Sequence, residues 1–234
     1  MRYTIDKTIF ELNHNIKFGI LIAHNIQNSE TMQDDEERLR KAEIKMREEI
    51  KAEELRELHN VALYRDVMTK SGINPNKYPP SVEAMFKRII KGGQLPEINA
   101  LVDLCNAVSI ENGISLGGHD LIDIHENLEV RYSKEGDIFL PFGAEEYEIV
   151  PIGELVFTSG NVVQTLKWVW RQSELGKLTV DSHDVFFQLV GFEYEEGSSL
   201  YNAMNEIETL VKDRFQGVCT KYIVDINNPS IEFK

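Results

Sequence analysis

The spacing of apolar and polar residues predicts a chain that combines strands with helices. Residues 2–10 alternate roughly between apolar and polar side chains, and residues 16–26 form a nearly continuous apolar run. Both patterns are typical of β-strands. Residues 28–57 are instead rich in Glu, Lys and Arg, with an apolar stripe at helical spacing formed by Leu39, Ala42, Met46 and Ile50. This segment predicts a long charged helix, which we expect to be peripheral because its apolar stripe is narrow.

Residues 78–121 contain two further predicted helices and a strand. The first helix follows a Pro-Pro-Ser sequence and ends at Gly92-Gly93, a pair that suits the left-handed end of a helix. The second helix begins after a Leu-Pro pair and ends at Asn112-Gly113. A short apolar strand over residues 114–116 follows. We expect residues 117–120, Gly-Gly-His-Asp, to form a loop that brings backbone amides near a ligand.

The second half of the chain is predicted to be mostly sheet. Turn sequences rich in glycine separate short apolar runs, which is the pattern of β-hairpins. The expected strand pairs are residues 128–132 with 138–140, and residues 154–157 with 162–168. A strand over residues 185–192, a helix over 199–215 and a closing strand over 218–226 complete the pattern. Strands, hairpins and one-sided helices together predict a mixed α+β domain.

Three short polar residues share one face of the second helix of the 78–121 segment. Asn99, Asp103 and Asn106 lie beside its apolar stripe, although Asn and Asp are poor helix formers. They can form a buried network that braces the next loop, or they can contact a ligand, and both roles are compatible. We expect Asp103 to be buried and paired with a basic or amide group, with Arg88 and Arg171 as candidate partners.

Read in order, residues 78–121 resemble the B3/B4 domain of the phenylalanyl-tRNA synthetase beta chain. In that domain a helix is followed by Pro-Ile-Asn, Val-Asp, Asn, Gly and Pro-Leu-His before an Asp-Leu pair. The matching residues here are Ile98-Asn99, Val102-Asp103, Asn106, Gly113, Leu116 and Asp120-Leu121. The chain departs from the pattern at two positions, because Gly117 stands where the family has the histidine and Ser115 stands where it has the proline.

The resemblance implies both a fold and an activity. The implied fold is α+β, a three-layer sandwich of two β-sheets with helices on one side, to which the charged helical arm is added. We expect one domain over residues 1–234, with the charged helices as an insertion at about 28–70. Within the synthetase this domain hydrolyses mischarged tyrosyl-tRNA. The resemblance therefore implies tRNA, or the 3′ end of an aminoacyl-tRNA, as a partner.

A second motif, Trp168-Val169-Trp170-Arg171-Gln172-Ser173, resembles a Trp-Asn-Trp-Arg-Gln-Ser pattern of stand-alone B3/B4 relatives. The family side chain that recognises the tyrosine hydroxyl maps near Gln172 or Ser173. We expect the two tryptophans to pack on one sheet face. Arg171 beside Gln172 can read a carboxylate, a phosphate or the terminal adenosine. Arg171, Gln172 and Ser173 are therefore candidate substrate-binding residues.

Charge and composition limit the partners and the location. The net charge of −14 opposes non-specific nucleic-acid binding, so any contact with tRNA must be local. The two cysteines, Cys105 and Cys219, are too few for a disulfide framework and are expected to be reduced thiols. Neither a metal site nor a cofactor is expected. The sequence shows no signal-peptide pattern and no membrane-spanning apolar run, so we expect a cytoplasmic location.

Two functions are compatible with these residues. The first is a freestanding deacylase that hydrolyses mischarged aminoacyl-tRNA in trans, and the alternative is a non-catalytic module that binds an amino acid or an aminoacyl-tRNA. In the first case Asn99 and Asn106 orient the loop and the ester, the amides of Gly117 and Gly118 stabilise the oxyanion, and His119 substitutes for the missing family histidine. The expected substrate-binding residues are Asp103, Asn106, Arg171, Gln172 and Ser173. We expect the asparagines, the glycine amides, His119, Arg171 and Gln172 to surround one cavity.

Overall fold

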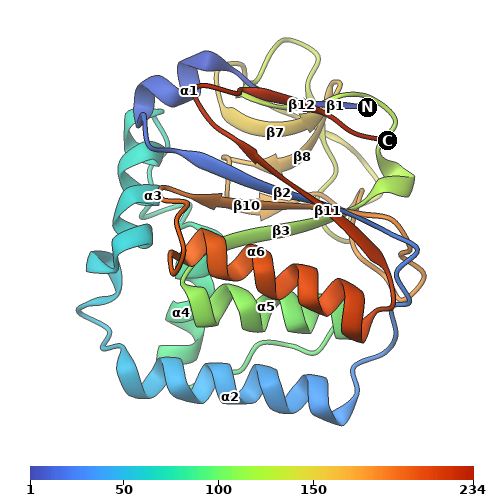
Figure 1. The fold of residues 1–234 in the computed structure, drawn as a ribbon. Coiled ribbons are helices and arrows are strands. Elements are labelled where there is room, and N and C mark those ends of the chain that lie inside the picture. Colours follow the sequence, from blue (N-terminus) through green and yellow to red (C-terminus); the bar gives the residue numbers. More distant parts are fainter.

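The computed structural model describes residues 1–234 and arranges them as two β-sheets with helices on one side (Figure 1). The larger, eight-stranded sheet has the order β12-β1-β4-β7-β8-β5-β6, with β9 paired to β8. Its strands are β1 (Arg2–Ile5), β4 (Leu128–Tyr132), β5 (Ile138–Phe139), β6 (Glu148–Ile149), β7 (Leu155–Ser159), β8 (Val162–Leu166), β9 (Arg171–Gln172) and β12 (Ser230–Glu232).

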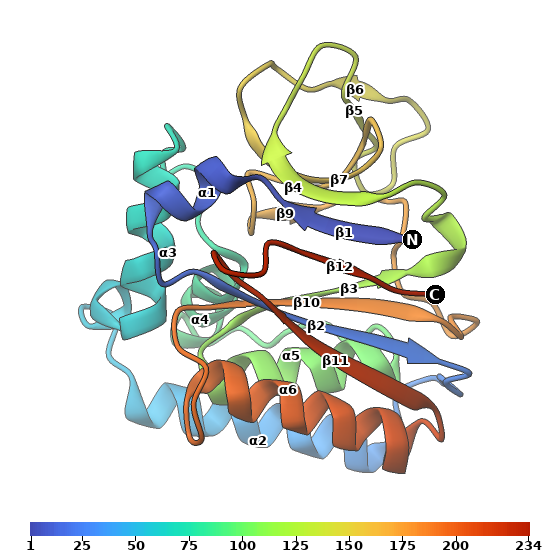
Figure 2. The same cartoon turned by 45° about the horizontal axis from the view of Figure 1, so that its top comes forward.

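The smaller, four-stranded sheet lies between the larger sheet and most of the helices (Figures 1 and 2). Its order is β11-β2-β10-β3, formed by β2 (Lys17–His24), β3 (Ser115–Asp120), β10 (Val185–Gly191) and β11 (Val218–Val224). The helices are α1 (Lys7–Leu12), α2 (Gln33–Glu49), α3 (His59–Lys70), α4 (Ser81–Ile90), α5 (Ala100–Asn112) and α6 (Ser199–Thr209). Short helical turns occur at Leu55–Glu57, Leu121–Asp123 and Leu210–Arg214. None of the helices combines the length and the apolar character that crossing a bilayer requires.

The core has two main parts, one on each face of the smaller sheet. Between the sheets, Tyr3, Phe157 and Phe186 are fully buried and in mutual aromatic contact, with the Phe157 and Phe186 rings stacked at 5.8 Å between centroids. On the other face, α5 and α6 cover the sheet with a second apolar cluster. Strand β10 is therefore buried on both faces, which explains why it is apolar apart from Gln188. The predicted α+β arrangement of two sheets with helices on one side is confirmed.

Helix α2 adds a further layer, because it packs along α5 on the side away from the sheets (Figure 1). Leu39, Ala42 and Met46 are buried and belong to the main apolar cluster. Asp35 is also buried, and its carboxylate pairs with Arg214 at 2.7 Å. The helix is thus the outermost layer, and its narrow apolar stripe is buried against the main cluster. That the sheets fold without this helix stays a prediction.

Three local predictions differ from the structure. Residues 7–12 form helix α1 and not a continued strand, because Asp6 caps the helix by accepting from the Thr8 N–H at 3.0 Å. Residues 117–120 continue strand β3 and do not form a loop, since they pair with β10. Strands β4 and β5 do not form a hairpin, because β4 pairs with β1 and β7 while β5 pairs with β6 and β8. The second predicted hairpin, β7 with β8, is confirmed.

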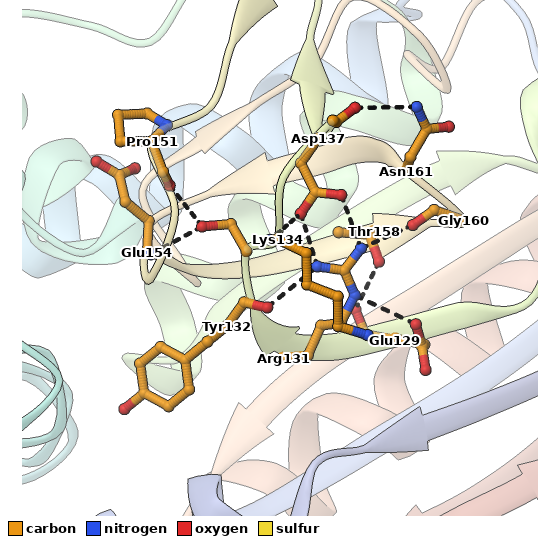
Figure 3. Close-up of polar contacts among 12 residues, drawn as sticks. Glu129, Arg131, Tyr132, Lys134, Asp137, Pro151, Glu154, Thr158, Gly160 and Asn161 are labelled. Atoms are coloured by element: carbon orange, nitrogen blue, oxygen red, sulfur yellow. Dashed lines mark hydrogen bonds and ion pairs between the residues drawn. The ribbon is translucent and has the colours of Figure 1, made fainter.

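A buried ion pair replaces the expected hairpin contacts beyond β4 (Figure 3). The Arg131 guanidinium donates to both carboxylate oxygens of Asp137, at 2.7 and 3.0 Å, and also to the Gly160 carbonyl at 2.9 Å. Both side chains are almost fully buried. Burial by itself would raise the pKa of Asp137, but hydrogen bonds from Arg131 and from the Lys134 N–H outweigh burial and lower that pKa. The pair thereby ties the turn after β4 to the turn between β7 and β8.

We predict that Asp137→Asn lowers the free energy of unfolding by about 3 kcal/mol, because the buried Arg131 charge loses its bidentate partner and keeps only the half-exposed Glu129 at 3.2 Å. Urea unfolding near neutral pH measures this change. The control is Glu37→Gln, which removes the exposed Lys41–Glu37 pair and is expected to change stability by less than about 1 kcal/mol. Equal effects of the two substitutions would contradict the structural role of the buried pair.

Candidate functional site

Two cavities adjoin at strand β3, which forms an edge of the smaller sheet. The inner cavity, about 80 Å³, lies where β3 and β10 face the larger sheet, and its polar lining includes Ser115, His119, Thr165, Trp168, Gln172 and Gln188. The outer cavity, about 260 Å³, lies between β3, α5 and the segment that follows β9, and its lining includes Asn106, Gly118, Phe142, Lys177 and Leu178. Leu116, Gly117 and Gln172 line both cavities. A ligand at Gly117 therefore has access to both.

The backbone of β3 is only partly paired on its free edge. The Gly118 carbonyl accepts from the Gln172 side-chain amide at 2.9 Å, and the Asp120 N–H donates to the Gly176 carbonyl at 2.9 Å. Because the N–H and C=O of one residue in an extended strand point to the same side, the Gly118 N–H also faces this free edge. Gly117 faces the opposite way, toward Gln188 of β10. Of the two glycines, Gly118 thus presents its amide N–H to the outer cavity.

His119 takes part of the space that a side chain at position 117 would occupy. Residues 117 and 119 lie on the same face of β3, and a Cβ built on Gly117 would lie 3.4 Å from His119 Nε2. His119 Nδ1 lies 3.4 Å from the Gln172 Nε2 amide, whose two hydrogens are directed at the nearer carbonyls of Gly118, at 2.9 Å, and Gly176, at 3.3 Å. His119 Nε2 forms no hydrogen bond within the protein. His119 therefore presents an unpaired ring nitrogen on the Gly117 side of the inner cavity.

The imidazole of His119 is neutral throughout the physiological pH range. The residue is 1% exposed and packs edge-on against Phe157, at 5.0 Å between ring centroids. Burial lowers the pKa of His119 to about 3. A histidine with so low a pKa is a weak general base but an effective neutral hydrogen-bond donor.

Trp168 reaches the inner cavity through an unusual backbone conformation. Lys167 and Trp168 have φ angles of 51° and 68°, so two successive non-glycine residues are left-handed, which costs on the order of 1–3 kcal/mol each. The predicted strand ends at Leu166 for this reason. The Trp168 indole is fully buried, packs edge-on against Tyr64 and lines the inner cavity, and its Nε1 has no hydrogen-bond partner. Lys167, the residue before Trp168, is held in place by an ion pair with Glu154 at 2.6 Å.

Asn99 and Asp103 form a bracing network outside both cavities. Asn99 caps α5 by accepting from the Val102 N–H at 3.1 Å, and it donates to the Leu178 carbonyl at 3.1 Å. Asp103 is fully buried, as expected, but its partners are the Thr31 hydroxyl at 2.6 Å and the Ile98 N–H at 3.0 Å. Neither Arg88 nor Arg171 contacts it, so that part of the expectation is wrong. Burial raises the pKa of Asp103 in spite of these hydrogen bonds.

The remaining predicted residues divide between the cavities and the exterior. Asn106 is the one member of the polar helix face that lines the outer cavity, and Gln172 lines both cavities. Ser173 is buried away from them, with its hydroxyl donating to the Leu140 carbonyl at 3.1 Å. Arg171 is exposed, makes no ion pair and lines neither cavity. Arg171 and Asn99 therefore do not share the cavity with Gln172, because neighbouring side chains of β9 alternate between faces and because Asn99 is occupied as a cap.

Several cavity residues were not predicted from the sequence. Gln188 is the only polar side chain in an apolar strand, and this contrast was a usable signal. Trp168 was expected only to pack. Phe142 and Lys177 lie in connecting segments that no motif marks, and they reach the outer cavity because the chain folds back across β3.

The family of the chain follows from comparison with known proteins. The model of the B3/4 domain matches residues 63–224, which is more than half of the chain. The chain therefore belongs to the B3/4 domain family. No curated protein matches it.

A solved structure shares the fold. It is the crystal structure of an N-terminal fragment of the phenylalanyl-tRNA synthetase beta-subunit from Pyrococcus horikoshii, with a TM-score of 0.50 and 9% sequence identity. The match covers 94% of this chain and 53% of that one, so the present chain spans about half the length of the fragment. At this identity the likeness concerns the fold alone.

We predict that Gly117→Ala and Gly118→Ala differ in stability. A Cβ at Gly117 meets only His119 Nε2 at ordinary contact distance, whereas a Cβ at Gly118 would lie 2.7 Å from Leu178 Cδ1. Gly118→Ala should therefore cost about 1–3 kcal/mol of unfolding free energy, and Gly117→Ala much less. Urea unfolding measures the free energy of both variants. An equal loss of unfolding free energy in the two would contradict the difference in free space beside Gly117 and Gly118.

We predict that His119 makes stability fall as the pH falls. A histidine has a pKa of about 6.5 in the unfolded chain, against about 3 in the folded protein. Between about pH 6.5 and pH 3 only the unfolded chain binds a proton at this histidine. The contribution of His119 to the free energy of unfolding is therefore complete above about pH 6.5 and falls below it, by up to about 1.4 kcal/mol per pH unit.

The measurement for this prediction is the unfolding free energy at about pH 7 and about pH 5. His119→Gln should flatten the pH dependence, and His14→Gln, which changes an exposed histidine, should leave it unaltered. A wild-type slope retained in His119→Gln would rule out the assignment.

Proposed function

We propose that the two adjoining cavities bind the aminoacylated 3′ end of a tRNA and that the protein hydrolyses the ester of wrongly attached amino acids. The observation that carries this proposal is the junction at Gly117 of a small cavity, about 80 Å³, with a larger one, about 260 Å³. An aminoacyl ester has the same division, with a compact side chain on one side of the carbonyl and a nucleotide on the other. Membership of the B3/4 domain family and the fold shared with the synthetase fragment support tRNA as the carrier.

Each part of the ester has a matching group in this arrangement. The amino-acid side chain enters the inner cavity, and the carbonyl lies at β3, where the Gly118 N–H donates to its oxygen. The terminal base stacks on Phe142, which is 49% exposed at the outer cavity. Lys177, in the same cavity and paired with Glu174, supplies a cation for the phosphate. This local contact is compatible with a strongly acidic protein.

Hydrolysis at this site depends on positioning more than on a protein base. Water adds to the ester carbonyl, the oxyanion is stabilised by the Gly118 N–H, and the ribose oxygen leaves with the proton. No carboxylate lines either cavity, and His119 is too weak a base at its lowered pKa. We therefore assign the proton transfer to the neighbouring ribose hydroxyl of the tRNA, and orientation of the water to Asn106 and Gln172.

The second candidate is a module that binds an amino acid or an aminoacyl-tRNA without hydrolysing it. The specific observation in its favour is the absence of a side chain at Gly117, where the related synthetase domain carries a histidine. The same cavities would then hold the ester intact.

The test is release of amino acid from a panel of mischarged tRNAs, compared with a reaction without protein. We expect release from at least one ester. Phe142→Ala should weaken tRNA binding by about 5- to 150-fold, the usual value of one base–aromatic stack. Lys177→Ala should weaken binding more than Arg171→Ala, which removes the same charge outside the cavities.

The outcomes separate the two functions. Release that depends on Phe142 and Lys177 supports the deacylase. Binding of aminoacyl-tRNA without release from any ester supports the non-catalytic module. If the protein neither binds aminoacyl-tRNA nor releases the amino acid, both functions are contradicted.

A further inference from the structure

We infer that the inner cavity selects a short, uncharged amino-acid side chain that carries a hydroxyl group, the class of threonine and serine. This inference rests on the proposed function, because it assumes that the inner cavity receives the amino-acid side chain. It goes further by naming the chemistry that the cavity recognises.

The first argument is an excess of unpaired donors. Trp168 lines the cavity, and its Nε1–H is buried without a partner. His119 Nε2 has no hydrogen-bond partner either, and it is a further donor in the tautomer that carries the proton on Nε2. Gln188 accepts from the Tyr3 hydroxyl at 2.7 Å through its oxygen, so its amide nitrogen remains a donor, and no protein group accepts from it. Because an unsatisfied buried donor is costly, an oxygen atom in the cavity would stabilise the complex.

The second argument concerns charge. No Lys, Arg, Asp or Glu lines the inner cavity. Lys167 is the cation nearest in sequence to Trp168, but it is paired with Glu154 and lies over the Tyr78 ring at 4.5 Å. A carboxylate in this cavity would be desolvated without a counter-charge, which is strongly unfavourable. The accepting oxygen therefore belongs to a neutral group.

The third argument concerns size. The cavity of about 80 Å³ is roughly half of the 150 Å³ that accommodates a benzene ring in an engineered protein cavity. A side chain the size of threonine fills this space, whereas a phenol ring would extend beyond it. The Ser81 and Ser115 hydroxyls, 3.2 Å apart, add polar surface at the same wall. The preference thus differs from the tyrosine handled by the related synthetase domain.

The test uses threonine and valine, which have nearly the same shape and differ by the hydroxyl. Threonyl-, valyl-, tyrosyl- and aspartyl-tRNA are compared as substrates at equal concentration. We expect threonyl-tRNA to be hydrolysed on the order of 100-fold faster than valyl-tRNA, since a site that hydrogen-bonds a hydroxyl rejects the analogue without it. Equal rates for threonine and valine, or a faster rate for tyrosine or aspartate, would overturn the inference.

Trp168→Phe tests the proposed donor directly, because it removes the Nε1–H and keeps an aromatic ring. The ratio of threonyl to valyl hydrolysis should fall by about 5- to 150-fold, the value of one lost buried hydrogen bond. The valyl rate serves as the internal control for folding, since a misfolded variant would lose both activities together. An unchanged ratio in a folded variant would remove Trp168 from the recognition.

Failure of the proposed function is distinguished by a binding experiment. Non-hydrolysable 3′-amide analogues of threonyl- and valyl-adenosine are titrated into the protein by calorimetry. Preferred binding of the threonyl analogue without hydrolysis of any ester supports the hydroxyl preference and contradicts the deacylase. Equal binding of the two analogues contradicts the hydroxyl preference, whatever the hydrolysis assay shows.

Discussion

The incomplete pairing of β3 is the constraint on which the site depends. An edge strand exposes backbone donors and acceptors that must find partners, and here the segment after β9 supplies only some of them. Gln172 and Gly176 satisfy the Gly118 carbonyl and the Asp120 N–H. The Gly118 N–H stays directed at the free edge. The same contacts join β9 and the segment after it to β3, so this strand edge borders both cavities and provides their polar backbone group.

The inner cavity lowers the stability of the fold, and a few positions account for this loss of free energy. Lys167 and Trp168 adopt left-handed conformations, and the Trp168 N–H remains unpaired in a fully buried position. Strain and unsatisfied donors persist only where the surrounding structure enforces them. The ion pair of Lys167 with Glu154 and the packing of Trp168 on Tyr64 provide that enforcement. Such features favour a binding role over simple packing.

The rest of the fold provides a rigid frame for this edge. Asn99 caps α5 and ties it to the segment at Leu178, which lies beside Gly118. Arg131 and Asp137 fix the turns of the larger sheet on the far side. The polar residues of the chain thus separate into a buried structural group with satisfied hydrogen bonds and a cavity group with open ones. Asn99 and Asp103 differ from His119, Trp168 and Gln188 mainly in whether their polar groups have hydrogen-bond partners in the protein, and less in residue type.

The sequence by itself determined the local elements and the family resemblance. Helical spacing predicted α4 and α5, turn residues predicted the β7–β8 hairpin, and the motif around Asn99 to Leu121 indicated the B3/B4 fold. Polar residues placed beside an apolar stripe also predicted correctly that Asp103 is buried. These features depend on neighbouring residues, whose periodicity and turn chemistry are visible in one dimension.

Only the tertiary structure decided which of the predicted residues meet. Gly117 to Asp120 read as a loop because glycines are unfavourable in strands, yet pairing with β10 extends the strand through them. The surface that covers the apolar stripe of helix α2 became visible only with α5 beside it, and Arg171 looked like a ligand-binding residue until β9 turned it outward. Phe142, Lys177 and Gln188 reach the site from segments far apart in the chain. Their proximity results from non-local strand pairing, and local sequence patterns do not encode this pairing, because its energy comes from contacts between distant residues.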